Sequence, residues 1–246
     1  MMKVGMLGLS NPIKKERIQK EKEWLEAQGI VVEISPLLFQ ESSGKERAEV
    51  FNTWVQKGFD YLFDVSGGDL ANETIPYLDY EAYKNSSTIY FGYSDLTCVI
   101  NALYTKTKKS SILFSICANK NKNDISDFLF NRNEKLLENE GKKVLGGNIR
   151  CFLKLAGSPY FPNLKDQTLF LESYSGNERR IRAYFAQLYT MGVFHEISSL
   201  ILGQFTEMEE SGEYGKVVDI AKSYFPNVEI QKNIGHSRDS KGLRIG

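Results

Sequence analysis

Strand-like and helix-like segments alternate along the first half of the chain, and this rhythm constrains the fold more than any other feature. Short apolar or β-branched runs occur at residues 4–9, 30–34, 59–65, 88–91 and 111–117. Between them lie amphipathic stretches at residues 14–28, 46–57 and 96–104. Strands that alternate with helices form a parallel sheet covered by helices on both faces. The sequence therefore predicts an α/β fold.

The rhythm changes after a polar, turn-rich stretch at residues 119–124, which we interpret as a linker. Beyond it, we expect strands at 168–171, 200–202 and 228–230 and helices at 178–191 and 217–224. A chain of 246 residues fits one large domain or two modest ones. We predict two, with residues 1–120 forming an N-terminal α/β domain and residues 121–246 a second, C-terminal domain.

Charge and hydropathy exclude several classes of function. Lys and Arg number 31, as do Asp and Glu, so the formal net charge is zero and nothing favours nucleic acid or an anionic membrane. The Lys-rich patch at residues 106–122 is expected to be a solvated rim. No segment approaches the roughly 20 apolar residues that span a bilayer. The apolar start ends at Ser10 and is too short for a signal peptide, so we expect a cytoplasmic protein.

The cysteines and histidines argue against a metal site. Cys98, Cys117 and Cys151 form an odd set without metal-type spacing, and the chain has only two histidines. We therefore expect neither a metal nor another cofactor. The three cysteines are interpreted as small core residues in a reducing compartment.

Two loops that follow predicted strands could carry chemistry, because sites in open α/β sheets form at the carboxyl ends of strands. One is Ser66-Gly67-Gly68, whose glycines let backbone N–H groups approach a ligand. The other is Gly92-Tyr93-Ser94-Asp95, a strand-to-helix corner with a serine at its apex. This corner lacks the second glycine of Gly-x-Ser-x-Gly, and the alternative is that Ser94 and Asp95 merely cap the next helix.

A nucleophilic serine needs a base, and only His195 and His236 offer an imidazole. His195 follows an amphipathic helix, where it would complement the helix dipole or lie on the surface. His236 follows Gly235 in a loop just after a predicted strand, a more usual place for a functional group. The small number of histidines and the loop position of His236 both favour His236 as the base.

The third member should be a carboxylate that orients the imidazole. Glu172 directly follows the apolar run 168–171, and a buried carboxylate there is costly unless it is paired. The alternative is a structural salt bridge with a nearby arginine, namely Arg179, Arg180 or Arg182. Spacing leaves both alternatives open.

Several blocks of the chain, taken together in order, resemble the LD-carboxypeptidase family of serine peptidases and the related microcin C immunity proteins. The most specific are Val65-Ser66-Gly67-Gly68, Phe91-Gly92-Tyr93-Ser94-Asp95, Leu169-Phe170-Leu171-Glu172 and Gly235-His236. Further matching blocks lie at residues 72–79, 146–149, 157–160, 201–206 and 243–246.

The resemblance implies that Ser94 is a nucleophile with Glu172 and His236 as its partners. It also implies an oxyanion hole formed by the backbone N–H groups of Gly68 and Asp95. The expected fold is an N-terminal parallel-sheet α/β domain plus a smaller β-rich α+β domain. The site would lie between the two domains, and the family's frequent dimers make a homodimer an expectation.

The resemblance also bears on the substrate. Family members release the terminal D-amino acid of murein tetrapeptides across an L,D bond, without a metal. The immunity branch instead cleaves aminoacyl-nucleotide analogues. We therefore expect a small peptide or peptidyl-nucleotide substrate, with a catalytically silent binding protein as the third alternative.

Four departures from the family pattern bear on the substrate more than on the three site residues. A Gly-Pro element expected after the last strand of the first domain is missing around residues 115–119. Ser173 stands where a second acid is usual, and Arg244 replaces a proline. The chain stops at Gly246, where members normally continue with another strand, so we expect it to be short or truncated.

Overall fold

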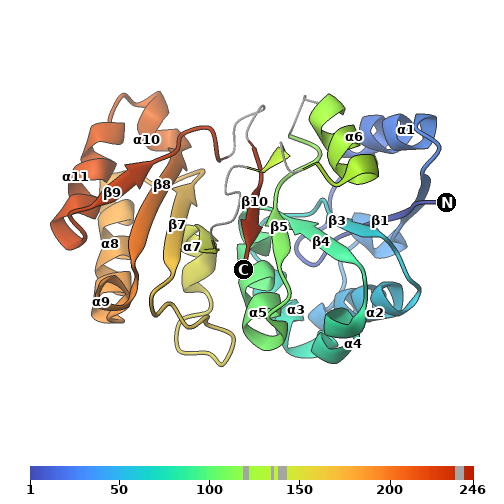
Figure 1. The fold of residues 1–246 in the computed structure, drawn as a ribbon, viewed down its shortest axis with the longest axis horizontal. Helices are drawn as coiled ribbons and strands as arrows, with labels where there is room; N and C mark the ends of the chain where they lie inside the picture. Colours follow the sequence, from blue (N-terminus) through green and yellow to red (C-terminus); the bar gives the residue numbers. More distant parts are fainter. Residues whose placement is uncertain (119–121, 134–135, 138–142, 236–240) are drawn as a thin grey trace.

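A computed structural model describes residues 1–118, 122–133, 136–137, 143–235 and 241–246. In this part of the chain one ten-stranded sheet runs through the whole molecule, in the order β2-β1-β3-β4-β5-β10-β6-β7-β8-β9 (Figure 1). The strands are β1 (Lys3–Leu7), β2 (Val31–Ile34), β3 (Tyr61–Asp64), β4 (Ile89–Gly92), β5 (Ser111–Leu113), β6 (Val144–Asn148), β7 (Thr168–Ser173), β8 (Ser199–Phe205), β9 (Val228–Ile230) and β10 (Leu243–Ile245).

The sheet is mainly parallel, which confirms the predicted α/β class. Strands β1 to β5 pair in parallel, as do β6 to β9. The exception is β10, which pairs antiparallel with β5 and contacts β6 through Ile245 and Val144. The last strand of the chain therefore joins the N-terminal strands to the C-terminal ones.

Helices cover both faces of the sheet. In Figure 1, α1 and α6 lie on one side of the N-terminal strands, and α2, α4 and α5 lie on the other. The α-helices are α1 (Gln19–Ala27), α2 (Gly44–Gln56), α3 (Ala71–Thr74), α4 (Tyr80–Asn85), α5 (Thr97–Thr107), α6 (Lys122–Asn131), α7 (Ile149–Leu153), α8 (Glu178–Thr190), α9 (Val193–Glu196), α10 (Thr206–Glu210) and α11 (Tyr214–Tyr224). The 3₁₀ helices given for the described ranges are η1 (Lys15–Arg17), η2 (Pro36–Phe39), η3 (Ile75–Tyr77) and η4 (Ser94–Leu96).

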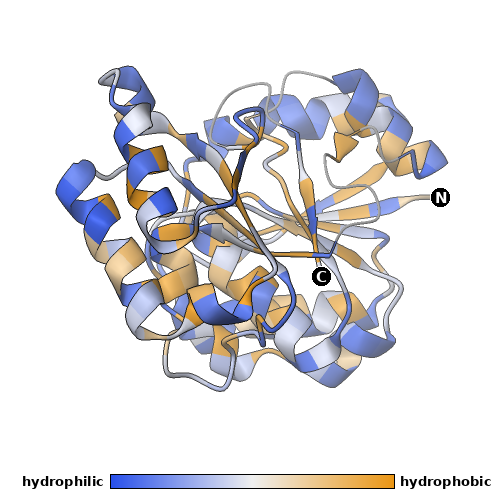
Figure 2. Cartoon of the chain, turned by 60° about the vertical axis from the view of Figure 1, so that its left-hand side comes forward, coloured by the Kyte–Doolittle hydropathy of each residue, from blue (hydrophilic) through white to orange (hydrophobic). Residues whose placement is uncertain are grey.

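Side chains alternate between the two faces and build two cores. Met6 and Phe63 pack with α1 and α6, whereas Leu7 and Leu62 belong to a larger core. That larger core also holds residues from α5, α8 and α11, so it spans both halves of the chain. Figure 2 shows the apolar strands inside and hydrophilic colour on the outward surfaces of the helices. None of the described helices is both long and apolar enough to cross a bilayer.

Some expected elements have different bounds. The first helix begins at Gln19, because the preceding residues form the 3₁₀ turn η1. The strand expected at 111–117 ends at Leu113, because the chain turns where the Ala118 N–H donates to the Ser115 carbonyl. The expected linker gives way to α6 at Lys122. The division into domains at residue 120 stays a prediction.

Candidate functional site

Ser94 occupies a strained corner between β4 and α5. Its φ of 56° lies in the left-handed region, which costs a residue with a side chain about 1 to 3 kcal/mol. The corner is also tight, since a Cβ on Gly92 would lie 2.7 Å from Leu96 Cβ. Neither η4 nor α5 begins with a side-chain cap, so the alternative that Ser94 and Asp95 are helix caps is wrong. The geometry is that of a serine presented at the apex of a strand-to-helix turn.

The Asp95 side chain holds the corner in place. Its buried carboxylate accepts hydrogen bonds from Ser10 Oγ at 2.7 Å and from the Ala71 N–H at 2.9 Å, and it pairs with Lys154, which directly follows α7. These contacts tie the corner to the loops after β1 and β3. The Asp95 backbone N–H meanwhile belongs to the first turn of η4.

Gly68 lies in the loop after β3, and its neighbours orient its peptide group. The Gly67 carbonyl accepts from the Asn11 N–H at 3.2 Å. Because a trans peptide directs its N–H opposite to its carbonyl, the Gly68 N–H points away from Asn11. The Gly68 carbonyl accepts from Arg150 at 3.0 Å. A Cβ on Gly68 would lie 2.4 Å from Asn11 Oδ1, so a glycine is required there.

Ser94 and the Gly67–Gly68 loop open onto one cavity of about 420 Å³. Both halves of the chain line it, because Tyr174 follows β7 whereas the other lining residues precede residue 119. The lining residues are Arg17, Asp64, Ser66, Gly67, Gly68, Tyr93, Ser94, Ser115, Ala118 and Tyr174. A ligand in this cavity would meet the serine and the glycine loop together.

Glu172 is fully buried near the carboxyl end of β7. Its register partner on β6 is Asn148, whose N–H donates to Thr97 Oγ1 at the start of α5. Burial raises the pKa of the neighbouring Tyr93 well above its ordinary value, and the Glu172 carboxylate adds to this shift as a charge and a hydrogen-bond acceptor. Tyr93, the residue before Ser94, thus connects Glu172 to the corner.

The arginines proposed as salt-bridge partners of Glu172 have different surroundings. Arg179, Arg180 and Arg182 are exposed on α8, and Arg182 pairs with Glu178 at 3.6 Å. Glu172, in contrast, has no exposed surface. The structure therefore favours an environment of Tyr93 and β6 for this carboxylate over a surface salt bridge.

His236 lies outside the described residues, so its position relative to Ser94 is a prediction. The residues before it are described. The Ile234 carbonyl accepts from the Gln204 N–H of β8 at 2.9 Å, and Gly235 packs against the Gln204 side chain. Since β8 pairs with β7, the loop that leads to His236 starts one strand from β7, which carries Glu172.

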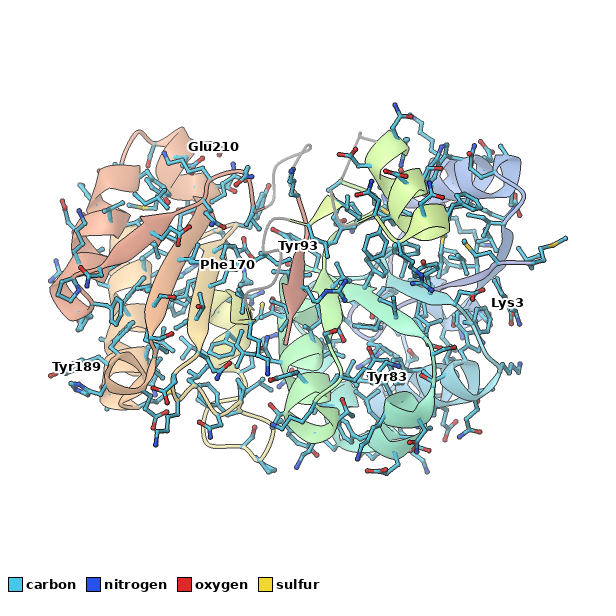
Figure 3. The ribbon with its side chains drawn as sticks, viewed as in Figure 1. Lys3, Tyr83, Tyr93, Phe170, Tyr189 and Glu210 are labelled. Atoms are coloured by element: carbon cyan, nitrogen blue, oxygen red, sulfur yellow. The ribbon has the colours of Figure 1, made fainter. Side chains whose placement is uncertain are left out.

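His195 is exposed on α9, with its ring 6.0 Å from that of Tyr189. In Figure 3, Tyr189 lies at the outer end of the C-terminal half, whereas Tyr93 lies near the middle of the molecule. His195 is therefore a surface residue of α9, as expected, and is remote from the corner.

The cysteines have structural surroundings. Cys98 and Cys151 are buried, and the Cys98 thiol donates to the Asp95 carbonyl at 3.0 Å. Burial raises the pKa of both thiols above the ordinary value and that of Cys117 to about 12. In the described ranges no group of three or more His, Cys, Asp and Glu side chains is arranged to hold a metal ion.

Several residues of the site were not identified from the sequence. Asn11, Arg150 and Lys154 hold the two loops from distant parts of the chain, and no local pattern marks them. Asp64 does carry a signal, because it ends an apolar strand, much as Glu172 directly follows the apolar residues of β7. Applied consistently, that signal would have identified both carboxylates.

The fold and the cavity define a mixed α/β protein with a candidate ligand site at the carboxyl ends of its central strands. A family model described as the LD-carboxypeptidase N-terminal domain matches residues 4–113, and the model of the C-terminal domain matches residues 141–246. These matches cover most of the sequence. The chain belongs to the LD-carboxypeptidase family.

Relatives with known names support the same membership. A protein of Vibrio cholerae, named as an inferred carboxypeptidase, is 26% identical over 88% of this chain and 81% of its own length. The microcin C7 self-immunity protein MccF of Escherichia coli is 25% identical over 77% of this chain and 71% of its own.

Solved structures share the fold at low sequence identity. MccF in its wild-type apo state superposes with a TM-score of 0.83 and 21% identity, covering 100% of this chain and 91% of MccF. A muramoyltetrapeptide carboxypeptidase from Oxalobacter formigenes superposes with a TM-score of 0.81 and 18% identity, covering 100% and 93%.

Proposed function

We propose that this protein is a serine hydrolase in which Ser94 is the nucleophile, His236 the general base and Glu172 the acid that orients it. One observation carries the proposal: a serine with φ of 56° at a strand-to-helix corner lines the same cavity as the Gly67–Gly68 loop. Strained backbone of this kind is typical of active sites. Membership of the LD-carboxypeptidase family supports hydrolysis as the class of reaction.

The mechanism follows from these roles. Ser94 Oγ attacks the scissile carbonyl while His236 takes its proton and then returns it to the leaving amine. The backbone N–H groups of Gly68 and Asp95 would bind the oxyanion. Losing one such donor typically costs about 3 to 4 kcal/mol of transition-state stabilisation. Water then releases the acyl group by the same steps.

For the substrate we propose an L,D-peptide bond, such as the bond to the terminal D-Ala of murein tetrapeptides. The carboxypeptidase names of relatives support it, and exposed Arg17 on the cavity wall could receive a substrate carboxylate. The second candidate is an aminoacyl-nucleotide analogue. It is supported by the similarity to MccF, which has been solved with glutamyl sulfamoyl guanosine and aspartyl sulfamoyl adenosine.

The test is to incubate the protein separately with a murein tetrapeptide and with an aspartyl sulfamoyl adenosine, and to follow both by mass spectrometry. Release of D-Ala supports the carboxypeptidase, and cleavage of the nucleotide analogue supports the immunity-type hydrolase. Ser94→Ala is the control and should reduce turnover by roughly four or more orders of magnitude. Binding of either compound without turnover would instead identify a silent binding protein.

Location and assembly are part of the same proposal. The free thiols of Cys98, Cys117 and Cys151 suit a reducing compartment, so we propose the cytoplasm. We propose a small-molecule substrate and a homodimer, which size-exclusion chromatography with light scattering would test.

A further inference from the structure

Asp64 is a buried carboxylate on the cavity wall that the proposed mechanism does not use. It ends β3 and is 5% exposed. Four donors surround it. Oδ1 accepts from the Ser66 N–H at 3.0 Å and from Ser66 Oγ at 2.6 Å. Oδ2 accepts from the Leu9 N–H at 2.9 Å and from the Tyr90 hydroxyl at 2.9 Å.

These hydrogen bonds connect Asp64 to both loops that shape the glycine turn. Ser66 directly precedes Gly67, and Ser66 Oγ also accepts from the Ser10 N–H at 3.1 Å. Leu9 and Ser10 directly precede Asn11, whose N–H holds the Gly67 carbonyl. One carboxylate thus fixes the residues on both sides of the hydrogen bond that orients the Gly68 N–H.

The groups around Asp64 are mostly neutral. Tyr90 bonds to it from β4, and burial raises the pKa of Tyr90 and of Tyr93 far above the ordinary value, so both stay protonated. Burial likewise raises the pKa of Asp64 to about 6, while its bonds to Ser66, Tyr90 and Leu9 lower it. The other ionisable groups nearby are Arg17 and Tyr174 on the cavity wall and, beyond Ser10, the ion pair of Asp95 with Lys154.

We propose that Asp64 is a positioning residue whose ionised carboxylate holds the Ser66-Gly67-Gly68 turn so that the Gly68 N–H faces the oxyanion. The proposal rests on the hydrolase function proposed above. Four donors need an acceptor-only group, and an ionised carboxylate is one. Protonation turns one oxygen into a donor, so at least one of the four hydrogen bonds is lost, or is reversed where its partner is the hydroxyl of Ser66 or Tyr90. The protonated form then holds the turn less firmly, and turnover requires an ionisation additional to that of the general base.

A fluorophosphonate probe tests this without knowledge of the substrate. Ser94 Oγ forms a bond to phosphorus, fluoride leaves and the serine proton passes to the general base, so the labelling rate reports the nucleophile and the oxyanion hole. The rate is measured between pH 4.5 and 9 on the full chain, with circular dichroism to confirm folding at each pH. If two groups must be ionised, the logarithm of the labelling rate rises with pH at a limiting slope of 2 in the acid range. If only one group must be ionised, that slope is 1.

Three variants separate positioning from a general structural role. Asp64→Asn should lower the plateau rate about 10- to 100-fold and reduce the acid slope from 2 to 1. Tyr90→Phe removes a hydrogen bond that lowers the pKa of Asp64, so the acid limb should move to higher pH. Asp60→Asn is the matched control, since Asp60 precedes the other end of β3 and its carboxylate accepts from the Lys3 N–H at 2.7 Å, away from the glycine turn.

Each result decides the proposal. It is supported if Asp64→Asn loses the second ionisation, Tyr90→Phe shifts it and Asp60→Asn retains the wild-type profile. If Asp64→Asn shows the wild-type pH dependence of labelling, the positioning role of Asp64 is overturned but the hydrolase assignment is not. If Asp64→Asn fails to fold, a wild-type pH dependence in Tyr90→Phe has the same meaning. A wild-type protein that is not labelled at any pH overturns the hydrolase assignment and this role with it.

Discussion

Gly67 and Gly68 are neighbours in one loop, yet the structure places different demands on them. Gly68 has a φ of 120° and would direct a Cβ onto Asn11 Oδ1, whereas a Cβ on Gly67 meets nothing within 4 Å. Gly68→Ala should therefore displace the turn and lower the labelling rate of Ser94 about 100-fold or more, because an oxyanion donor moves.

Gly67→Ala is the matched control and should stay within about threefold of the wild type, with labelling rates measured side by side. If both variants lose the same share of the labelling rate, the loop tolerates no side chain at either glycine. If both keep the wild-type labelling rate, the Gly68 N–H is not an oxyanion donor.

Asp64 also gives a prediction about stability. Its pKa is raised from 3.8 to about 6 in the folded protein, so folding favours the protonated form. The stabilisation from protonation is fully present below pH 3.8 and is lost as the pH rises through about 6. Between pH 4.5 and 8, Asp64→Asn should therefore gain about 2 kcal/mol of unfolding free energy relative to the wild type. Urea denaturation at the two pH values measures this, and a constant difference would contradict it.

At the scale of elements, β6 and α5 depend on the Gly146-Gly147 pair. Gly147 has a φ of 134°, and a Cβ there would lie 2.7 Å from Thr97 Oγ1. We expect Gly147→Ala to destabilise the protein by about 2 to 4 kcal/mol through backbone strain and overpacking. The control is Gly215→Ala in α11, where a Cβ meets nothing and a better helix former should stabilise slightly. Thermal unfolding compares the two, and equal melting temperatures would contradict the packing described for β6.

The same elements show what the sequence could predict. The alternation of strand-like and helix-like segments predicted β1 to β5, because each of these strands lies between helices that cover a parallel sheet. Strand β6 was missed, because Gly146 and Gly147 look like a turn until Asn101 of α5 is seen to bind both backbone groups of Gly146.

The candidate site was predicted in part for similar reasons. Ser94 was selected as a candidate from its corner and Glu172 from its position after an apolar run, both of which are local signals. The hydrogen bonds of Asn11, Arg150 and Lys154 to the two loops join residues more than 50 positions apart. Pairing over such distances leaves no trace in local periodicity.

At the scale of the whole molecule, the sheet is continuous across the two halves of the chain. β10 lies between β5 and β6, and the larger core draws residues from both halves. We therefore expect one cooperative unfolding transition, with calorimetric and van't Hoff enthalpies that agree. Two separate transitions would instead show that residues 1–120 and 121–246 are independently stable domains.

The most direct test of the whole proposal is to locate the covalent adduct of the fluorophosphonate probe by peptide mass spectrometry. The wild-type protein should carry one adduct, on Ser94. Ser94→Ala and His236→Ala should carry none, and His195→Ala should be labelled like the wild type. An unlabelled wild-type protein, an adduct on another residue, or undiminished labelling of Ser94→Ala would contradict the assignment of Ser94 as the nucleophile.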